Sequence, residues 1–96
     1  MTVTPADRVS ALPAVIGRDV AGETVLLDLH SGVYYGLDAI GTRMWNLLME
    51  RRTLEEACGV MAGEYDVAPD VLRRDLLDLL RDLLERGLVV RETVEA

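Results

Sequence analysis

The hydrophobic period of this 96-residue chain changes once, at Asp38, and that change limits the folds open to it. Before Asp38, apolar residues alternate within short segments, which is the pattern of β-strands. After Asp38 they recur every three or four positions, which is the period of amphipathic helices. A chain of this length has room for one hydrophobic core. The sequence therefore predicts a single α+β domain with its sheet first and its helices second.

Three strands are predicted in the first part, over residues 14–20, 23–29 and 33–37. Ala21–Gly22 joins the first pair and His30–Gly32 joins the second pair. Connections this short require antiparallel neighbours, so the strands are expected to form a meander. In the second strand, Val25 and Leu27 share one face and Leu26 points to the other. We therefore expect some cover on both faces of the sheet.

Three helices are predicted after the sheet, over residues 38 to about 50, 53 to about 63 and 69 to about 86. Asp38 is placed to cap the first helix, and Thr53 with Glu56 has the spacing of a capping box for the second. Pro69 suits the first turn of the third helix, and Gly87 is expected to end it in the left-handed conformation.

In this order the elements predict a winged helix-turn-helix-like α+β fold, a three-stranded antiparallel sheet followed by three helices. The single domain is expected over residues 14–91. Residues 1–13, which contain two prolines, are predicted to be a flexible lead-in, and residues 92–96 a frayed tail. Leu88–Val90 is a candidate for a last short strand against the sheet.

Charge and cysteine content narrow the range of functions. The chain has 17 acidic residues against 10 basic ones, all arginine, for a net charge of −7. This balance opposes binding to nucleic acid and to anionic membranes, because both need a cationic surface. Cys58 is the only cysteine, so no internal disulfide can form. The chain also lacks a signal-peptide pattern and an apolar run near the ~20 residues of a membrane span, so a cytoplasmic protein is predicted.

The sequence shows no catalytic or metal-binding constellation. His30 and Cys58 fall in a turn and in a helix, whereas metal sites cluster such ligands. Cys58 lies on an apolar helical stripe, where a buried structural thiol is expected. The carboxylates are spread over helix surfaces rather than isolated in pairs, as tuned acid–base pairs are. We expect no enzymatic activity, no cofactor and no metal.

The predicted third helix has a wider apolar face than contact with one core requires. At 100° per residue its seven leucines span an arc of roughly 160°, against about 100° for an ordinary surface helix. They are Leu72, Leu76, Leu77, Leu79, Leu80, Leu83 and Leu84. Arg73 lies inside this arc, and Gly41 of the first helix would allow a close approach to a neighbour. Two interpretations stay open: all seven leucines belong to the core, or part of the face lines a groove for a ligand.

The predicted third strand has an unguarded edge. It carries no charge and no proline, whereas the first strand has Arg18 and Asp19 near its end, which discourages edge pairing. A peptide pairing there would gain main-chain hydrogen bonds, with the third helix as the far wall and at least one tyrosine in the core. Arg73 would then pair with an acidic peptide residue, or its stem would only cover leucines. The candidate peptide-binding residues are Val33, Tyr34, Tyr35, Gly36, Arg73, Leu76, Leu77 and Leu80.

A winged helix-turn-helix arrangement also raises DNA binding, with the third helix in the major groove. That region, residues 70–86, has four arginines against five acidic residues and no basic stripe. Peptide capture is therefore favoured over DNA binding.

Several motifs, taken together in their order along the chain, resemble those of the PqqD-like family. They are Gly22–Asp28, Ser31–Asp38, Gly41, Trp45, Thr53–Glu56, Glu64–Tyr65 and Leu83–Val89. Members of this family are recognition elements for the precursors of ribosomally made, post-translationally modified peptides. The resemblance implies that the leader segment of such a precursor adds as a strand beside the third strand, in a groove against the third helix. It implies no catalytic residues.

Within the family, the Gly32–Asp38 run and the stand-alone length are most similar to the recognition protein of lasso-peptide pathways. That resemblance implies a separate leader peptidase as a partner, with a lactam-forming cyclase downstream. The branch that serves pyrroloquinoline quinone synthesis is the close runner-up.

Overall fold

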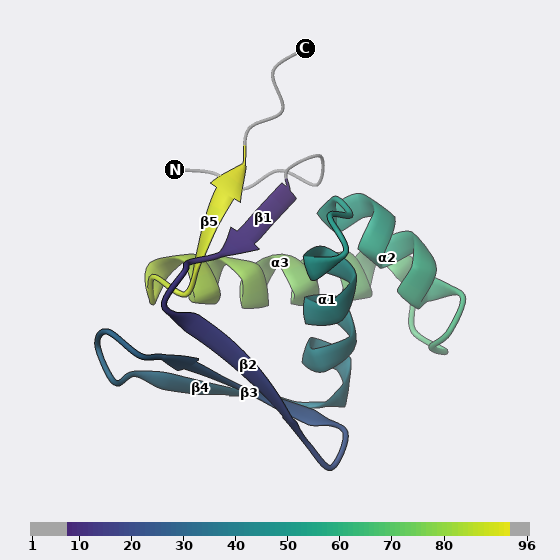
Figure 1. Ribbon diagram of the computed structural model, residues 1–96. Helices are drawn as coiled ribbons and strands as arrows, with labels where there is room; N and C mark the ends of the chain where they lie inside the picture. The colour runs from purple at the N-terminus through teal and green to yellow at the C-terminus, as the bar shows by residue number, and fades with distance from the viewer. Residues whose placement is uncertain (1–7, 93–96) are drawn as a thin grey trace.

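The chain folds into three helices and five strands over the residues that the computed structural model describes, 8–92 (Figure 1). In chain order they are β1 (Arg8–Ala11), β2 (Val15–Val20), β3 (Glu23–Asp28), β4 (Tyr34–Leu37), α1 (Ala39–Met49), α2 (Leu54–Ala62), α3 (Pro69–Glu85) and β5 (Val89–Glu92). The predicted α+β class, with a three-stranded antiparallel sheet before three helices, is confirmed. No helix among these residues is long and apolar enough to cross a lipid bilayer.

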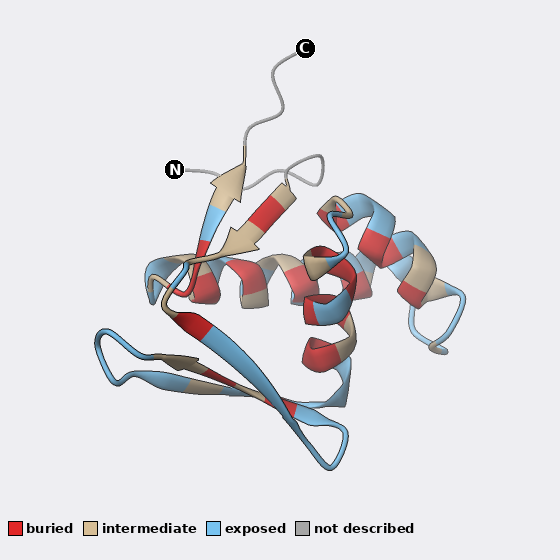
Figure 2. Ribbon diagram, viewed as in Figure 1, coloured by how far each residue is buried: buried red, intermediate tan, exposed pale blue. Residues whose placement is uncertain are grey.

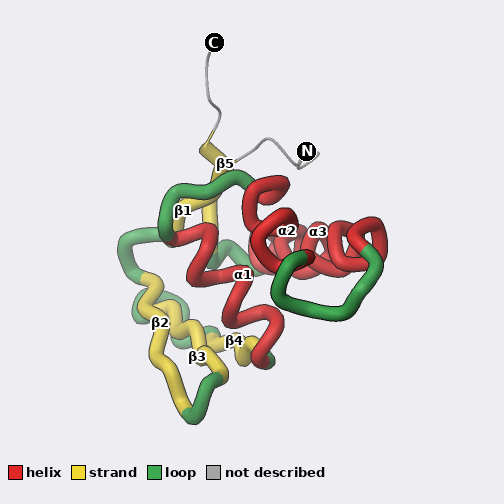
Figure 3. The backbone as a smooth tube through the Cα atoms, turned by 90° about the vertical axis from the view of Figure 1, so that its right-hand side faces the viewer, coloured by secondary structure: helices red, strands yellow, loops and turns green. Residues whose placement is uncertain are grey.

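The sheet β2–β3–β4 is an antiparallel meander with β3 in the centre. Ala21 and Gly22 both have positive φ angles, of 56° and 86°, which suits a two-residue hairpin turn. Figure 3 shows α1 between this sheet and the α2–α3 pair. The helices therefore lie on one side of the sheet.

Only one face of the sheet is covered, which differs from the expected cover on both faces. Leu26 and Thr24 of β3 are buried under the helices. On the opposite face Ile16 and Val20 are exposed, and β2 appears mostly pale blue in Figure 2. Alternation along the strands could not decide which face the helices would choose, because both faces carry apolar residues.

A second, two-stranded sheet joins the ends of the chain. β1 pairs antiparallel with β5, with Ala11 opposite Val89 and Arg8 opposite Glu92. The expected lead-in is therefore a strand over residues 8–11, and Val9 within it is 1% exposed. The last strand does form, but against β1 rather than against the three-stranded sheet, and it includes the first residue of the expected tail. The rest of both terminal predictions, residues 1–7 and 93–96, lies outside the described residues.

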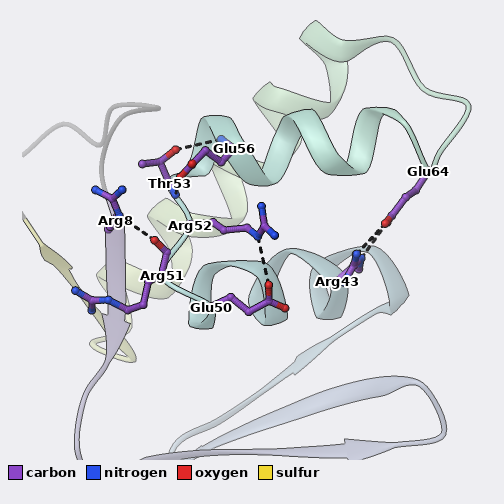
Figure 4. Close-up of polar contacts among 8 residues, drawn as sticks. All are labelled: Arg8, Arg43, Glu50, Arg51, Arg52, Thr53, Glu56 and Glu64. Atoms are coloured by element: carbon purple, nitrogen blue, oxygen red, sulfur yellow. Dashed lines mark hydrogen bonds and ion pairs between the residues drawn. The ribbon is translucent and has the colours of Figure 1, made fainter.

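The predicted helix boundaries are confirmed by their caps. The Asp38 carboxylate accepts a hydrogen bond of 2.8 Å from a backbone N–H in the first turn of α1. Thr53 and Glu56 form both hydrogen bonds of the capping box, at the start of α2 (Figure 4). Pro69 is the first residue of α3, and Gly87 follows the helix with a φ of 73°.

Polar contacts tie the helices to their surroundings (Figure 4). Arg43 of α1 donates two hydrogen bonds, of 2.9 and 2.8 Å, to the carboxylate of Glu64 after α2. Arg8 of β1 donates a hydrogen bond of 2.8 Å to the carbonyl oxygen of Arg51, which follows α1. The two-stranded sheet is thereby attached to the α1–α2 connection.

The leucines of α3 divide into two groups. Four are fully buried in the core: Leu72, Leu76, Leu80 and Leu83. Three are partly buried against it: Leu77, Leu79 and Leu84. The middle of the wide apolar arc therefore packs into the core, and the leucines at its two margins stay partly exposed. Cys58, as expected, is a buried thiol, and burial raises its pKa.

Candidate functional site

β4 is an edge strand with one neighbour. Within residues 8–92 it pairs with β3 alone. The carbonyl oxygen of Val33, just before β4, accepts a hydrogen bond of 2.8 Å from Asp28 at the end of β3. Hydrogen-bonded and non-hydrogen-bonded pairs alternate along an antiparallel ladder, so Tyr35 also bonds to β3. The main-chain N–H and C=O groups of Tyr34 and Gly36 therefore point to the open side of β4.

A hollow of about 380 Å³ lies beside this strand, a volume within the usual range of ligand pockets. One wall is the end of β4 and the start of α1, and the other wall is the middle of α3. The residues that line it are Tyr35, Gly36, Leu37, Asp38, Ile40, Gly41, Asp75, Leu76 and Leu79.

Gly41 allows the two walls to approach each other. It is buried in α1, and a β-carbon added there would lie 3.2 Å from Cδ2 of Leu79 and 3.3 Å from Oδ1 of Asp38. Both distances are tighter than ordinary van der Waals contact. The expected close approach of the first helix to a neighbour is confirmed, and that neighbour is α3.

A polar contact ties β4 to the C-terminal part of α3. The hydroxyl of Tyr35 donates a hydrogen bond of 2.7 Å to Oδ2 of Asp82. Arg86 donates to the other oxygen of the same carboxylate at 3.0 Å, and its guanidinium lies 4.9 Å from the centre of the Tyr35 ring. The hydrogen bond raises the pKa of Tyr35 and lowers the pKa of Asp82. We call Tyr35, Asp82 and Arg86 the strand–helix clamp.

The structure brings some of the predicted site residues to the hollow. Tyr35, Gly36 and Leu76 line it, and Tyr35 also packs against the core, as expected for one of the two tyrosines. Val33 and Tyr34 are exposed, and Tyr34 lies on the opposite face of the sheet from Tyr35.

The other three predicted residues lie elsewhere on α3. Leu80 is fully buried, and Leu77 packs against the core. Arg73 is exposed and lies 3.9 Å from the carboxylate of Glu55 on α2. The structure therefore does not place these three in the hollow.

The helical period explains this division. At 100° per residue, Arg73, Leu77 and Leu80 lie to one side of Leu76 on α3, while Leu79 lies to the other side. The side that faces β4 is the side of Leu79 and, beyond it, Asp75. Leu79 belonged to the predicted apolar arc, so a signal for it was present. Nothing in the sequence distinguished Asp75, Ile40 or Gly41 as lining residues.

Domains that take up extended peptides by strand addition present a free strand edge of this kind, with pockets beside it for side chains. The family described as coenzyme PQQ synthesis protein D (PqqD) matches residues 23–89, and the chain belongs to this family. A search of curated proteins found no match.

Two solved structures are similar to the chain. One is TbiB1 in complex with the TbiA(beta) leader peptide, with 38% identity, 90% of this chain and 98% of that chain covered, and a TM-score of 0.78. The other is a lasso peptide synthetase B1 complexed with the leader peptide, with 23% identity, 86% and 98% covered, and a TM-score of 0.81. The second likeness shows the fold alone.

Proposed function

We propose that this protein binds the leader segment of a ribosomally made precursor peptide, as an added strand on β4 and in the groove against α3. The observation that carries the proposal is the open edge of β4 beside the hollow. The 38% identity with TbiB1, a protein solved with a leader peptide, supports it. In this arrangement the outward main-chain groups of Tyr34 and Gly36 bond to the guest strand.

The pathway that we propose is lasso-peptide biosynthesis, in the cytoplasm. The protein acts as a non-catalytic recognition element that delivers the bound leader to a separate leader peptidase, with a cyclase acting downstream. The resemblance of the Gly32–Asp38 run to the recognition protein of lasso-peptide pathways supports this assignment, and one of the two structures with the same fold is named a lasso peptide synthetase B1. A small sheet beside three helices likewise supports describing the fold as winged helix-turn-helix-like.

A role in pyrroloquinoline quinone synthesis is the second candidate, and the description of the matching family favours it. DNA binding receives little support from α3. Arg73 is within ion-pair distance of Glu55, and Arg81 is within ion-pair distance of Asp78 on the helix surface. The exposed side of α3 therefore offers alternating charge rather than a basic stripe.

The test is a titration of the full chain with two fluorescein-labelled probes, followed by anisotropy. One probe is the TbiA(beta) leader peptide, and the other is the N-terminal half of any short peptide encoded beside this protein's gene. We expect saturable binding to at least one probe. Binding to neither overturns the proposal. Binding to the second probe alone, when its source peptide is the precursor of pyrroloquinoline quinone, favours the second candidate.

A matched pair of variants tests strand addition. Tyr34→Pro removes an N–H that points away from β3, so the sheet tolerates it, as edge strands tolerate proline. Tyr34→Ala removes the side chain but keeps that N–H. We expect the Tyr34→Pro variant to bind the leader roughly tenfold more weakly than the Tyr34→Ala variant, because it loses one main-chain hydrogen bond to the peptide. Equal affinities in two folded variants would overturn the strand-addition mode.

A further inference from the structure

If a leader peptide adds as a strand on β4, as in the proposed function on which this inference rests, the register of β4 decides which leader side chain enters the hollow. We call that peptide the guest strand. Residues that face each other across a ladder point to the same face of the sheet. Tyr35 and Leu37 point toward the helices, so guest residues opposite them do too. The ring of Tyr35 is already held by the strand–helix clamp. Asp38, Ile40 and Gly41, which follow Leu37 in the chain, also line the hollow, so the guest residue opposite Leu37 lies nearest to it.

The hollow offers apolar contact at its base. Leu76 is fully buried, Leu79 is partly buried, and Ile40 is exposed by 37%. Gly41 contributes no side chain, so Leu79 and Asp38 both lie close to its α-carbon and line the hollow beside it. An extended hydrocarbon stem fits such a surface.

Carboxylates stand on the two opposite walls of the hollow. Asp38 lies on the β4–α1 wall and Asp75 on the α3 wall, and no cationic residue lines the hollow. The capping bond uses one oxygen of Asp38, and a carboxylate accepts several hydrogen bonds. The side chain of Asp75 has no hydrogen bond or ion pair within residues 8–92. Arg86, the nearby cation of the clamp, bonds to Asp82 instead.

We propose that this hollow selects a basic side chain, lysine or arginine, on the leader residue opposite Leu37. The aliphatic stem lies on Leu76, Leu79 and Ile40, and the cationic end lies between Asp38 and Asp75. Long cationic side chains bury their stems in this way while the charge stays at the polar rim. The excess of acidic residues over the whole chain adds to the attraction.

The experiment is a substitution scan on whichever labelled probe binds more tightly to the full chain. Each probe position is replaced in turn by lysine, by methionine, which has a similar length and no charge, and by glutamate. We expect one position at which lysine binds about three- to tenfold more tightly than methionine, and glutamate more weakly than either.

Two variants assign that preference to the hollow. Asp75→Asn is expected to bring the lysine-to-methionine ratio close to one at that position, and Asp75→Arg to make glutamate the preferred residue. The matched control is Asp78→Asn, which removes an equal charge from the exposed side of the same helix and should leave the ratio unchanged. A reversal of preference is a readout that a loss of stability would not produce.

The outcomes separate this inference from the proposed function. If a probe binds and Tyr34→Pro weakens it, but no position prefers lysine, the basic-residue inference alone is overturned. Equal effects of Asp75→Asn and Asp78→Asn also overturn it, since the preference would then reflect net charge. If neither probe binds, the proposed function is overturned, and the basic-residue inference is overturned with it.

Discussion

The hydroxyl of Tyr35 in β4 donates a 2.7 Å hydrogen bond to Asp82 in α3, across 47 positions of sequence. Arg86 lies over the same ring and bonds to the same carboxylate. The edge strand and the helix opposite it are therefore linked at one end of the groove. This link holds the edge of β4 in place before a peptide arrives, which reduces the ordering required on binding.

We expect Tyr35→Phe to weaken leader binding about three- to tenfold by releasing β4 from α3. The ring stays in the core, so the fold is expected to survive. Anisotropy titration with the labelled leader measures the change. Tyr34→Phe is the control, because it keeps the main chain and removes only a hydroxyl on the opposite face of the sheet from the hollow, and it should bind as the wild type does. Equal affinities for the two variants would show that the clamp does not position β4.

The clamp also predicts a pH window of stability. The pKa of Asp82 is lowered in the folded state, so its contribution is present above its ordinary value of about 4 and is lost as pH falls. The pKa of Tyr35 is raised, so its contribution is present below about 10 and is lost as pH rises through the folded value. Denaturant unfolding of wild type and Tyr35→Phe should therefore differ most between about pH 5 and 9. A difference that does not change with pH would contradict this account.

Gly41→Ala should separate binding from stability. Alanine favours the helix by up to about 1 kcal/mol over glycine, but its β-carbon lies too close to Leu79 and Asp38, so these two lining residues of the hollow must shift. We expect the unfolding free energy to stay within about 1 kcal/mol of wild type while leader affinity falls several-fold. Gly59→Ala in α2 is the control, because a β-carbon there meets nothing within 4 Å. If Gly41→Ala binds as tightly as Gly59→Ala, the hollow does not receive a leader side chain.

The stability of a Val9 variant tests whether β1 is part of the folded core. Val9→Ala removes two methyl groups from a fully buried position and is expected to lower the unfolding free energy by about 1.5–3 kcal/mol. Val90→Ala, at an exposed position in the paired strand β5, should cost less than about 0.5 kcal/mol. Urea denaturation of both variants measures the difference. If Val9→Ala left the unfolding free energy unchanged, residues 8–11 would be a flexible lead-in, as the sequence predicted.

The sequence by itself determined the features that depend on neighbours along the chain. The caps at Asp38 and Thr53 and the stop at Gly87 specified where helices begin and end, because they act through local hydrogen bonds and backbone angles. The short turns likewise determined the meander, and with it the open edge of β4.

Only the tertiary structure decided the features that depend on distant segments. The pairing of β1 with β5 brings together segments from near the two ends of the chain, and no local sequence pattern at Arg8–Ala11 predicted it. The leucine arc of α3 was apolar on both sides of Leu76, so periodicity could not tell whether Leu77 or Leu79 would face β4. The contact of Gly41 with Leu79 and the clamp from Tyr35 to Asp82 settled that choice, because a packed core admits only one rotation of the helix.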